Sequence, residues 1–376
     1  MTPFERTLRD VVAHDGPISV ERFMGLCLAH YYATRDPLGA RGDFTTAPEI
    51  SQMFGELLGL WAVEVWNAMD RPSPVRLVEL GPGRGTLMAD ALRAARVVPA
   101  FGDALAVHLV ETSPTLRERQ ERALQPTRAQ VSWHDTLEDV PSGPAIIIAN
   151  EFLDALPIRQ FVATERGWCE RLVGLRDGRL VFGVGTEPVG GLPPVQHLGD
   201  ILEWPRAATD LVAALARRLA GAGGAALLID YGYWGPAFGD TLQALRLHAR
   251  ADPLDSPGEA DLTAHVDFHR IVLTAGAEVR VHGPVRQGEF LDALGIRARA
   301  TSLKTRATAE QASDIDRAVD RLTARGATGM GELFKVICLS HPGLEFLPGL
   351  PPRPLLGADP MLMPGRAFAT QATAKS

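Results

Sequence analysis

Short runs of apolar residues alternate with amphipathic stretches through the middle of the chain. Four apolar runs are long enough to be strands, over residues 75–80, 105–110, 145–149 and 225–231. Three stretches repeat apolar residues at helical spacing, over residues 86–97, 114–124 and 209–220. Strands that alternate with helices are typical of a mostly parallel sheet covered by helices. The pattern therefore predicts an α/β fold with four buried strands.

The residues before this region have a helical pattern. Residues 18–32 are mixed apolar, and a second stretch repeats apolar side chains at helical spacing, namely Ile50, Met53, Phe54, Leu57, Trp61 and Val65. Thr46 and Glu49 stand at the two positions of a reciprocal capping box before this stretch, and Pro48 is tolerated early in a helix. We therefore expect an N-terminal helical segment and lid over residues 1–74.

An antiparallel ribbon is expected within the alternating region. Residues 160–182 alternate in hydropathy on either side of Arg176-Asp177-Gly178, which has the composition of a hairpin turn. The ribbon would be inserted at about 158–205 into a domain that spans residues 75–340.

The last part of the chain predicts closing strands and then a tail. Strands expected over residues 279–285 and 333–340 flank a helix over 309–325 and would close the sheet with an antiparallel last strand. Residues 341–376 contain seven prolines, which exclude a regular helix. We expect an extended tail that lies on the body or is partly mobile.

Composition narrows the class of protein. Of the 376 residues, 46% are hydrophobic and 22% are charged, which is typical of a folded globular protein. The net charge of −7 gives no global attraction to nucleic acid or to an anionic membrane. No apolar stretch reaches the roughly 18 residues of a membrane span. We expect neither a nucleic-acid partner nor membrane insertion.

The cysteines and lysines indicate a compartment and a source. Cys27, Cys169 and Cys338 lie far apart and form no CxxC pair, which fits a reducing compartment and predicts no metal cluster. The N-terminus lacks a secretory pattern, so a cytoplasmic location is expected. Only three of the 38 basic residues are lysines. We interpret this bias as genomic base composition and expect a bacterial source.

A glycine turn after the first apolar run carries the clearest candidate chemistry. Glu79-Leu80-Gly81-Pro82-Gly83-Arg84-Gly85-Thr86 joins a strand to a helix. Glycines allow the backbone to approach a ligand, and the helix N-terminus offers N–H groups, so a nucleotide-like ligand is expected. The dinucleotide fingerprint needs its third glycine where Thr86 stands, which disfavours NAD without excluding it.

Two acids follow the next strands. Glu111 stands at the end of the second apolar run, where a carboxylate can accept hydrogen bonds from both ribose hydroxyls. Asp135 follows Trp133-His134 and is placed to accept an exocyclic amino group, with Trp133 as a candidate wall for an adenine.

These features resemble class I S-adenosylmethionine-dependent methyltransferases, in which an acid precedes a G-x-G-x-G turn and the second strand ends in an acid. Five motifs narrow the resemblance to the MidA-like family, namely GDFTTAPEIS at 42–51, NEFLDALP at 150–157, DLTAHVDF at 261–268, QGEFL at 287–291 and MGELFK at 330–335. The resemblance runs from about Phe4 to Leu339. It implies a Rossmann-like class I methyltransferase fold with S-adenosylmethionine as the cofactor.

The resemblance also implies a substrate and a set of cofactor-binding residues. The mitochondrial member of the family is a complex I assembly factor that methylates an arginine of a complex I subunit, so a protein substrate such as a complex I subunit is expected here. Seven residues would bind the cofactor, namely Glu79, Gly81, Gly83 and Gly85 at its methionyl end, Glu111 at the ribose, Asp135 at the adenine, and Asn150. Arg84 is expected to point away on the helix.

The acids after the fourth apolar run are candidate catalytic residues. Glu151 and Asp154 would emerge at the carboxyl edge of the sheet, where ligands bind in open α/β sheets. Paired carboxylates suit a guanidinium, which stays protonated and presents a planar fork of donors. We expect Glu151 to orient the acceptor, and His265 or Asp267 to act as the base. Asp43, in the loop before the capped helix, would cover the cofactor or contact the substrate.

Other interpretations stay open from the sequence alone. Glu151 and Asp154 could be helix N-terminal acids that complement a helix dipole, and His265 could be a hydrogen-bonded structural residue. The protein could be a non-catalytic complex I assembly factor that binds S-adenosylmethionine. It could also be an NAD-dependent oxidoreductase, for which Thr86 is the discriminating defect.

Overall fold

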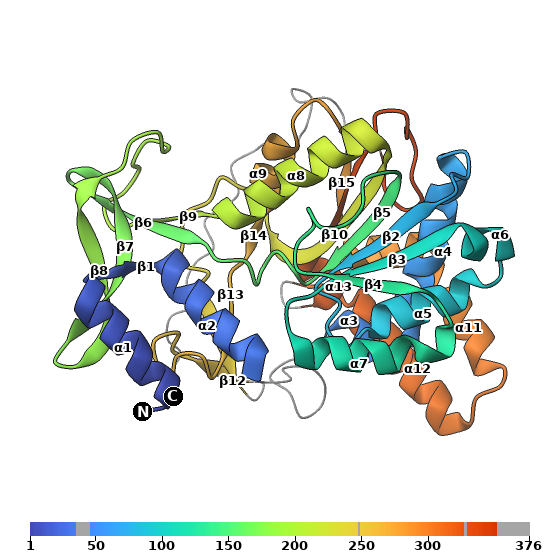
Figure 1. The fold of residues 1–376 in the computed structure, drawn as a ribbon, viewed down its shortest axis with the longest axis horizontal. Helices are drawn as coiled ribbons and strands as arrows, with labels where there is room; N and C mark the ends of the chain where they lie inside the picture. Colours follow the sequence, from blue (N-terminus) through green and yellow to red (C-terminus); the bar gives the residue numbers. More distant parts are fainter. Residues whose placement is uncertain (35–45, 247–248, 327–328, 352–376) are drawn as a thin grey trace.

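The computed structural model describes residues 1–34, 46–246, 249–326 and 329–351 (Figure 1). Asp43 lies outside the described residues, as do residues 352–376 of the expected tail. Figure 1 shows a large central sheet at the right and a smaller antiparallel sheet at the left, with α1 beside the smaller sheet and α2 between the two.

The central sheet has eight strands, seven of them in the order β15-β16-β10-β5-β2-β3-β4, while β14 pairs in parallel with the end of β10. The strands from β4 to β10 are parallel, whereas β16 runs antiparallel between β10 and β15. The bounds are β2 (Val75–Leu80), β3 (Leu105–Val110), β4 (Val131–His134), β5 (Ala145–Asn150), β10 (Gly224–Tyr233), β14 (Val266–Asp267), β15 (Arg280–Arg286) and β16 (Phe334–Ser340). The prediction of a Rossmann-like fold with an antiparallel last strand is confirmed. Strand β4 is an addition to the four predicted runs.

The central strands are apolar throughout because both faces of the sheet are covered. In β5, Ile146 and Ile148 pack into the core beneath α4 and α5, while Ile147 between them packs into the core beneath α8 and α9. A strand that is buried on both faces needs apolar residues at successive positions, which is the pattern that predicted it. The covering helices are α4 (Gln52–Ala68), α5 (Thr86–Ala95), α6 (Pro99–Ala104), α7 (Pro114–Leu124), α8 (Arg206–Ala222) and α9 (Phe268–Ala275).

The last helices come between β15 and β16. They are α10 (Gln287–Ala293), α11 (Ile296–Lys304), α12 (Ala309–Thr323) and α13 (Met330–Leu333), and one 3-10 turn, η1 (Gln125–Thr127), follows α7. The helix expected over 309–325 is thus α12. The described start of the tail lies on the body, with Leu344, Leu347 and Leu350 buried in the core beneath α4. In the ranges that the structure describes, no helix is long and apolar enough to cross a membrane.

The N-terminal helices are α1 (Pro3–Asp15), α2 (Val20–Thr34) and α3 (Ala47–Ile50), followed by α4. The predicted capping box was wrong. The Thr46 side chain makes no cap hydrogen bond, and Ser51 adopts an extended conformation that ends α3 and begins α4 by accepting a hydrogen bond from the Met53 N–H. Glu49 instead accepts a hydrogen bond from the Thr86 hydroxyl at 2.6 Å, so tertiary contact takes the carboxylate away from the cap.

The ribbon expected over 160–182 belongs to a five-stranded antiparallel sheet. Its strands are β1 (Ile18–Ser19), β6 (Arg159–Thr164), β7 (Gly167–Arg176), β8 (Arg179–Pro188) and β9 (Ile201–Trp204). The hairpin between β7 and β8 turns at Asp177 and Gly178, both with positive φ, as the turn residues predicted. A third sheet of three short strands was not predicted and comprises β11 (Gln243–Arg246), β12 (Ala249–Ala251) and β13 (Asp261–Thr263).

Replacing Gly59 with alanine is expected to lower the free energy of unfolding by about 1–3 kcal/mol, because a Cβ overpacks the contact between α4 and α5. That Cβ would lie 2.3 Å from the Ala91 carbonyl oxygen. Gly221→Ala in α8 is the matched control, because its Cβ would meet nothing within 4 Å. The control should keep or gain up to about 1 kcal/mol. Urea unfolding measures both variants, and an unchanged midpoint for Gly59→Ala would contradict the packing argument.

Candidate active site

A cavity of about 490 Å³ lies at the carboxyl ends of β2, β3 and β5. Its size is typical of a pocket for a small molecule or cofactor. Strand β2 is paired with β3 on one side and with β5 on the other, so the order of strands along the sheet reverses at β2. Open α/β sheets bind ligands at such a switch point, where the loops after neighbouring strands diverge.

The glycine turn forms one wall of this cavity. Gly81, Gly83 and Gly85 all have positive φ, at 63°, 53° and 80°. A Cβ on Gly81 would lie 2.6 Å from the Phe152 ring, so the turn and the loop after β5 approach too closely for any side chain. Gly81 and Gly83 line the cavity, whereas Gly85 faces Gln120 of α7 and is not among the lining residues.

Glu79 is buried at the end of β2 on the cavity wall. Glu79 is only 3% exposed, and its Oε2 atom has no hydrogen-bond partner. Burial raises the pKa of this carboxyl to about 8. A cationic ligand group in the cavity would stabilise the ionised form and offset the cost of burying it.

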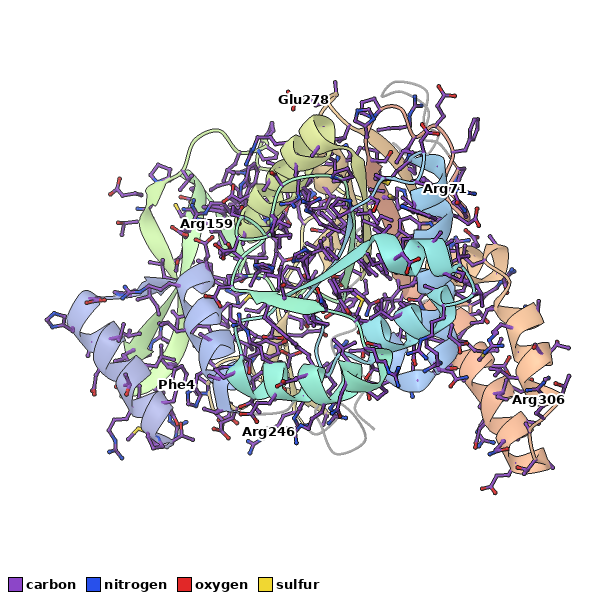
Figure 2. All side chains as sticks on the ribbon, turned by 45° about the vertical axis from the view of Figure 1, so that its right-hand side comes forward. Phe4, Arg71, Arg159, Arg246, Glu278 and Arg306 are labelled. Atoms are coloured by element: carbon purple, nitrogen blue, oxygen red, sulfur yellow. The ribbon has the colours of Figure 1, made fainter. Side chains whose placement is uncertain are left out.

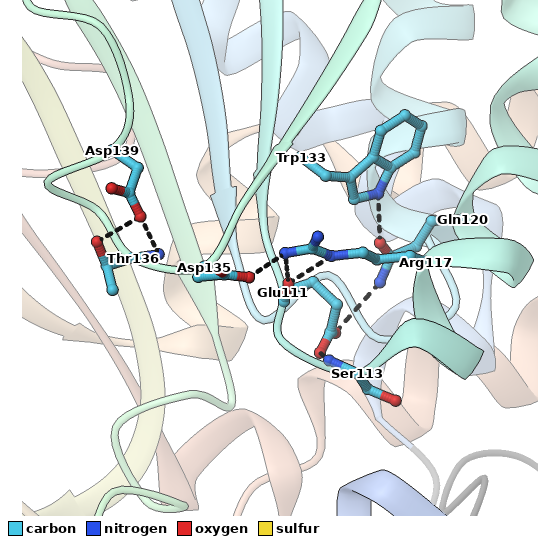
Figure 3. Close-up of polar contacts among 8 residues, drawn as sticks. All are labelled: Glu111, Ser113, Arg117, Gln120, Trp133, Asp135, Thr136 and Asp139. Atoms are coloured by element: carbon cyan, nitrogen blue, oxygen red, sulfur yellow. Dashed lines mark hydrogen bonds and ion pairs between the residues drawn. The ribbon is translucent and has the colours of Figure 1, made fainter.

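Glu111 is held in place by a network that Figure 3 shows. Its Oε1 accepts a hydrogen bond from the Ser113 N–H at 2.8 Å, and its Oε2 accepts one from Gln120 Nε2 at 3.2 Å. The same Gln120 nitrogen donates to the Gly83 carbonyl at 2.8 Å, and Gln120 Oε1 accepts from Trp133 Nε1 at 2.8 Å. One buried amide thereby fixes the glycine turn and the candidate ribose acid relative to each other.

Sequence reasoning missed Gln120, although a signal was present. Leu116, Gln120 and Leu124 are the buried residues of α7 and are spaced four apart, so a polar residue occupies an apolar position of the helix. A polar side chain at a core position needs buried partners, and these are Glu111, Gly83 and Trp133.

Trp133 and Asp135 differ in their position relative to the cavity, because only Asp135 lines it. The Trp133 indole packs against the core and is not among the residues that line the cavity. Asp135 lines the cavity, with a side chain that is 74% exposed and an ion pair to Arg117 at 2.6 Å. Arg117 also donates to the Glu111 carbonyl oxygen, which ties the loops after β3 and β4 together (Figure 3).

Glu151 follows β5 and lines the cavity together with Asn150. Its backbone has a φ of 51°, which is rare for a residue with a side chain. Glu151 Oε1 accepts hydrogen bonds from the Ala47 N–H at 3.1 Å and from Asn150 Nδ2 at 3.2 Å. Burial raises the pKa of this carboxyl to about 8. The structure therefore brings Glu151 to the same cavity as Glu79, as its place after β5 predicted.

The other candidate catalytic residues that the structure describes, Asp154, His265 and Asp267, are not among the residues that line the cavity. Asp154 is 6% exposed, its Oδ1 has no hydrogen-bond partner, and burial raises its pKa to about 6. His265 packs edge-on against the Tyr231 ring, and burial lowers its pKa. Asp267 caps α9 by accepting from the Arg270 N–H and also accepts from the Gly235 N–H, which is a structural role. Tyr231 contacts both Asp154 and His265.

The second helix forms a wall that the sequence did not predict. Residues of α2 line the cavity, namely Gly25, Leu28, Ala29, Tyr32 and Ala33. The Tyr32 hydroxyl donates to Asp261 Oδ1 at 3.1 Å, and its carbonyl accepts from the Ser113 hydroxyl at 2.9 Å. The apolar pattern of α2 carries no sign of this role, because a ligand-facing apolar side chain looks the same in sequence as a core side chain.

The charges around the cavity favour a cationic ligand. The lining includes five acidic residues, namely Glu49, Glu79, Glu111, Asp135 and Glu151. Among the described lining residues Arg84 is the one basic side chain, and it lies 3.7 Å from Glu49 rather than pointing away as expected. A pyrophosphate would meet repulsion here, whereas an ammonium or sulfonium would be attracted. Within the described ranges no three His, Cys, Asp or Glu side chains gather in a way that could hold a metal ion.

The parallel sheet, the glycine turn and the acid-rich cavity define a Rossmann-like methyltransferase. Residues 57–285, more than half of the chain, match a family model described as "Putative S-adenosyl-L-methionine-dependent methyltransferase". The chain belongs to this family and is an S-adenosylmethionine-dependent methyltransferase. The orphaned Glu79 oxygen and the glycine cradle fit that cofactor, and the prediction of its use is confirmed, which sets the NAD alternative aside.

Relatives and a solved structure agree with this assignment. "Protein arginine methyltransferase NDUFAF7, mitochondrial" of Danio rerio is 40% identical over 76% of this chain and 74% of the relative. The Drosophila melanogaster homolog, also named mitochondrial, is 37% identical over 90% of this chain and 85% of its own length. A COG1565 superfamily member of Burkholderia thailandensis, solved bound to S-adenosyl-homocysteine, has a TM-score of 0.78, 28% identity, and coverage of 92% and 93%. The bacterial, cytoplasmic location stays a prediction.

The buried acids predict how the stability of the cofactor-free protein changes with pH. Because the pKa of Glu79 is raised from 4.5 to about 8, its contribution to stability is present below the unfolded pKa and is lost as pH rises through the folded pKa. Glu79→Gln should therefore match the native protein near about pH 4, below the unfolded pKa, and melt at a higher temperature near about pH 9. Melting temperatures across this range measure the effect.

Glu56→Gln provides the control for this experiment. Burial opposes ionisation of Glu56, but the Arg299 and Arg93 guanidinium groups lower its pKa, so the control should be less stable than the native protein throughout. Parallel pH profiles for Glu79→Gln and the native protein would refute the assignment of a raised pKa to Glu79.

Proposed function

We propose that this methyltransferase N-methylates an arginine side chain of a protein acceptor, and that a subunit of respiratory complex I is that acceptor. The observation that carries the proposal is the Glu151 carboxyl group on the wall of the cavity, between Asn150 and Phe152, whose ring packs against the glycine turn. The relatives named protein arginine methyltransferases support it, since this chain covers about three quarters or more of their length. A cytoplasmic location in a bacterium is part of the proposal.

The cofactor would lie between the glycine turn and the acids at the ends of β2 and β3. Glu79, Gly81 and Gly83 would hold its methionyl end, where the Glu79 carboxylate faces positive charge. Glu111 would accept hydrogen bonds from the ribose hydroxyls, with Asp135 and Asn150 at the remaining contacts. Gly85 would act indirectly, because a Cβ there would lie 3.2 Å from the Gln120 backbone and disturb the residue that fixes Glu111.

Glu151 would orient the acceptor. A guanidinium stays protonated at ordinary pH and binds a carboxylate through its planar fork of N–H donors. Because Glu151 Oε1 is fixed by the Ala47 N–H and the Asn150 amide, the carboxylate has a defined direction. The bound cofactor supplies the methyl group. The protein would then contribute the orientation of the acceptor nitrogen toward the methyl group, rather than a strong nucleophile.

The proton balance gives Glu151 a second role. The acceptor nitrogen gains a methyl group and loses one proton, so the product guanidinium keeps a single positive charge. A bound cationic guanidinium would favour the ionised form of Glu151, and this carboxylate could then take that proton. Asp154 and His265 are not among the lining residues, so we assign them no contact with the acceptor. The alternative of a non-catalytic assembly factor does not explain a buried acid at this place.

Glu111→Gln is expected to weaken binding of S-adenosyl-homocysteine by about tenfold to a hundredfold, because hydrogen bonds to a charged acceptor are worth roughly 1.5–3 kcal/mol. Isothermal titration calorimetry measures the affinity. Glu118→Gln on the exposed face of α7 is the matched control and should bind as the native protein does, since its side chain is 74% exposed. Equal affinity of both variants would remove Glu111 from the cofactor site.

Glu151→Gln should keep the cofactor affinity within about twofold and lower methyl transfer by about a hundredfold or more, because both orientation and proton removal are lost. Transfer of labelled methyl groups to complex I subunits, with arginine and lysine peptides for comparison, measures turnover. Native turnover in the variant would contradict the role of Glu151. Cofactor binding by the native protein without transfer to any arginine substrate would favour the assembly-factor alternative.

A further inference from the structure

Asp230 lies near the end of β10 and reaches the loop that follows β5. Its Oδ2 atom accepts hydrogen bonds from three successive backbone N–H groups, those of Phe152 at 3.2 Å, Leu153 at 2.9 Å and Asp154 at 3.2 Å. Its Oδ1 atom accepts from its neighbour, the Tyr231 N–H, at 2.9 Å. The residue is 1% exposed, so this contact lies entirely inside the protein.

These bonds leave Asp230 little capacity to bind a ligand. Both carboxylate oxygens are engaged by backbone donors, and Asp230 is not among the residues that line the cavity. Burial and the neighbouring Asp154 and Glu151 carboxylates raise its pKa. Lys335, which stands opposite Asp230 in the register of β16, donates instead to the carbonyl oxygens of Glu332 and Leu333. The partners of Asp230 are thus the loop itself and the strand that carries it.

The loop has a conformation that needs such support. Glu151 has a φ of 51°, which costs a residue with a side chain roughly 1–3 kcal/mol and persists only where the surroundings enforce it. The Glu151 N–H donates to the Ile229 carbonyl at 2.8 Å, and the next three N–H groups all converge on Asp230. Four consecutive amides of the loop are therefore fixed by two adjacent residues of β10.

The fixed loop carries the groups on which methyl transfer would depend. Glu151 lines the cavity, and Phe152 packs against the Gly81 turn so closely that a Cβ on Gly81 would meet its ring at 2.6 Å. A shift of this loop would move the proposed acceptor-orienting acid and one wall of the glycine turn together. Small displacements of a reacting group have large effects on rate.

We propose that Asp230 is a positioning residue for methyl transfer, which holds residues 151–154 in the conformation that aims Glu151 at the acceptor. This inference rests on the proposed role of Glu151. Sequence reasoning did not find it, because Asp230 occurs in an apolar strand and its partners lie more than 70 positions earlier in the chain.

Asp230→Asn tests the proposal, because the amide keeps one oxygen for the loop and places an NH₂ group where the Tyr231 N–H needs an acceptor. The first readout needs no acceptor protein. Hydrogen exchange of the Phe152, Leu153 and Asp154 amides should speed up by about tenfold in the variant, as expected when a protecting hydrogen bond is weakened. Binding of S-adenosyl-homocysteine within about twofold of the native value would show that the variant is folded.

The second readout is a double-mutant cycle on turnover. Asp230→Asn should lower kcat by about tenfold with little change in KM for the cofactor, and Glu151→Gln should lower it by about a hundredfold. If Asp230 acts through Glu151, the double variant should be no slower than Glu151→Gln alone. Glu56→Gln is the control that removes a buried carboxylate elsewhere, and its kcat should equal that of the native protein.

The outcomes separate this inference from the proposed function. Multiplicative losses in the double variant, or unchanged exchange of the three amides in Asp230→Asn, would overturn the positioning role. Faster exchange together with native kcat in Asp230→Asn would also overturn it, since the loop would then be loosened without consequence. Absence of arginine methylation by the native protein would instead overturn the proposed function, and the exchange result would still report on the loop.

Discussion

Burial of carboxylates at the carboxyl edge of the central sheet is the constraint on which the site depends. Glu79, Glu151, Asp154 and Asp230 are all sheltered from water, and burial raises the pKa of each. Where backbone donors are available they are used, most fully at Asp230. At Glu79 an oxygen is left without a partner. An uncompensated acid is costly, so the cavity is built to be completed by positive charge.

The topology of the sheet explains why these acids meet. Parallel strands deliver their carboxyl ends to one edge, and β2, β5 and β10 are neighbours there. Each contributes an acid at or just beyond its last residues, so residues far apart in sequence converge without any special motif. The helices α2 and α3 then close the cavity from the other side, and the Ala47 N–H reaches Glu151. The edge of the sheet therefore supplies the acidic side chains of the cavity, and the N-terminal helices α2 and α3 supply part of its wall.

The sequence predicted what depends on local pattern. Strands β2 and β3 and helix α7 have the expected bounds, because continuous apolar runs and helical spacing record burial directly. Gly81, Gly83, Glu111 and Glu151 were found because each follows a predicted strand. Gln120 carried a signal, a polar residue at an apolar position of its helix, that was overlooked, whereas Asp230 and Tyr32 were missed because their partners lie in distant segments. The capping box failed for the same reason, since Thr86 competes for Glu49.

Strain and burial together argue for an enzyme rather than a binding protein. The left-handed backbone of Glu151 and the burial of its carboxyl group both reduce stability, and another residue at this position would fold more readily. A surface that only binds a partner needs neither of them. A carboxylate aimed into a cofactor cavity needs both, because the loop must turn sharply after β5 and the acid must be shielded from water. The loss of stability caused by strain and burial at Glu151 therefore falls at the position where methyl transfer would take place.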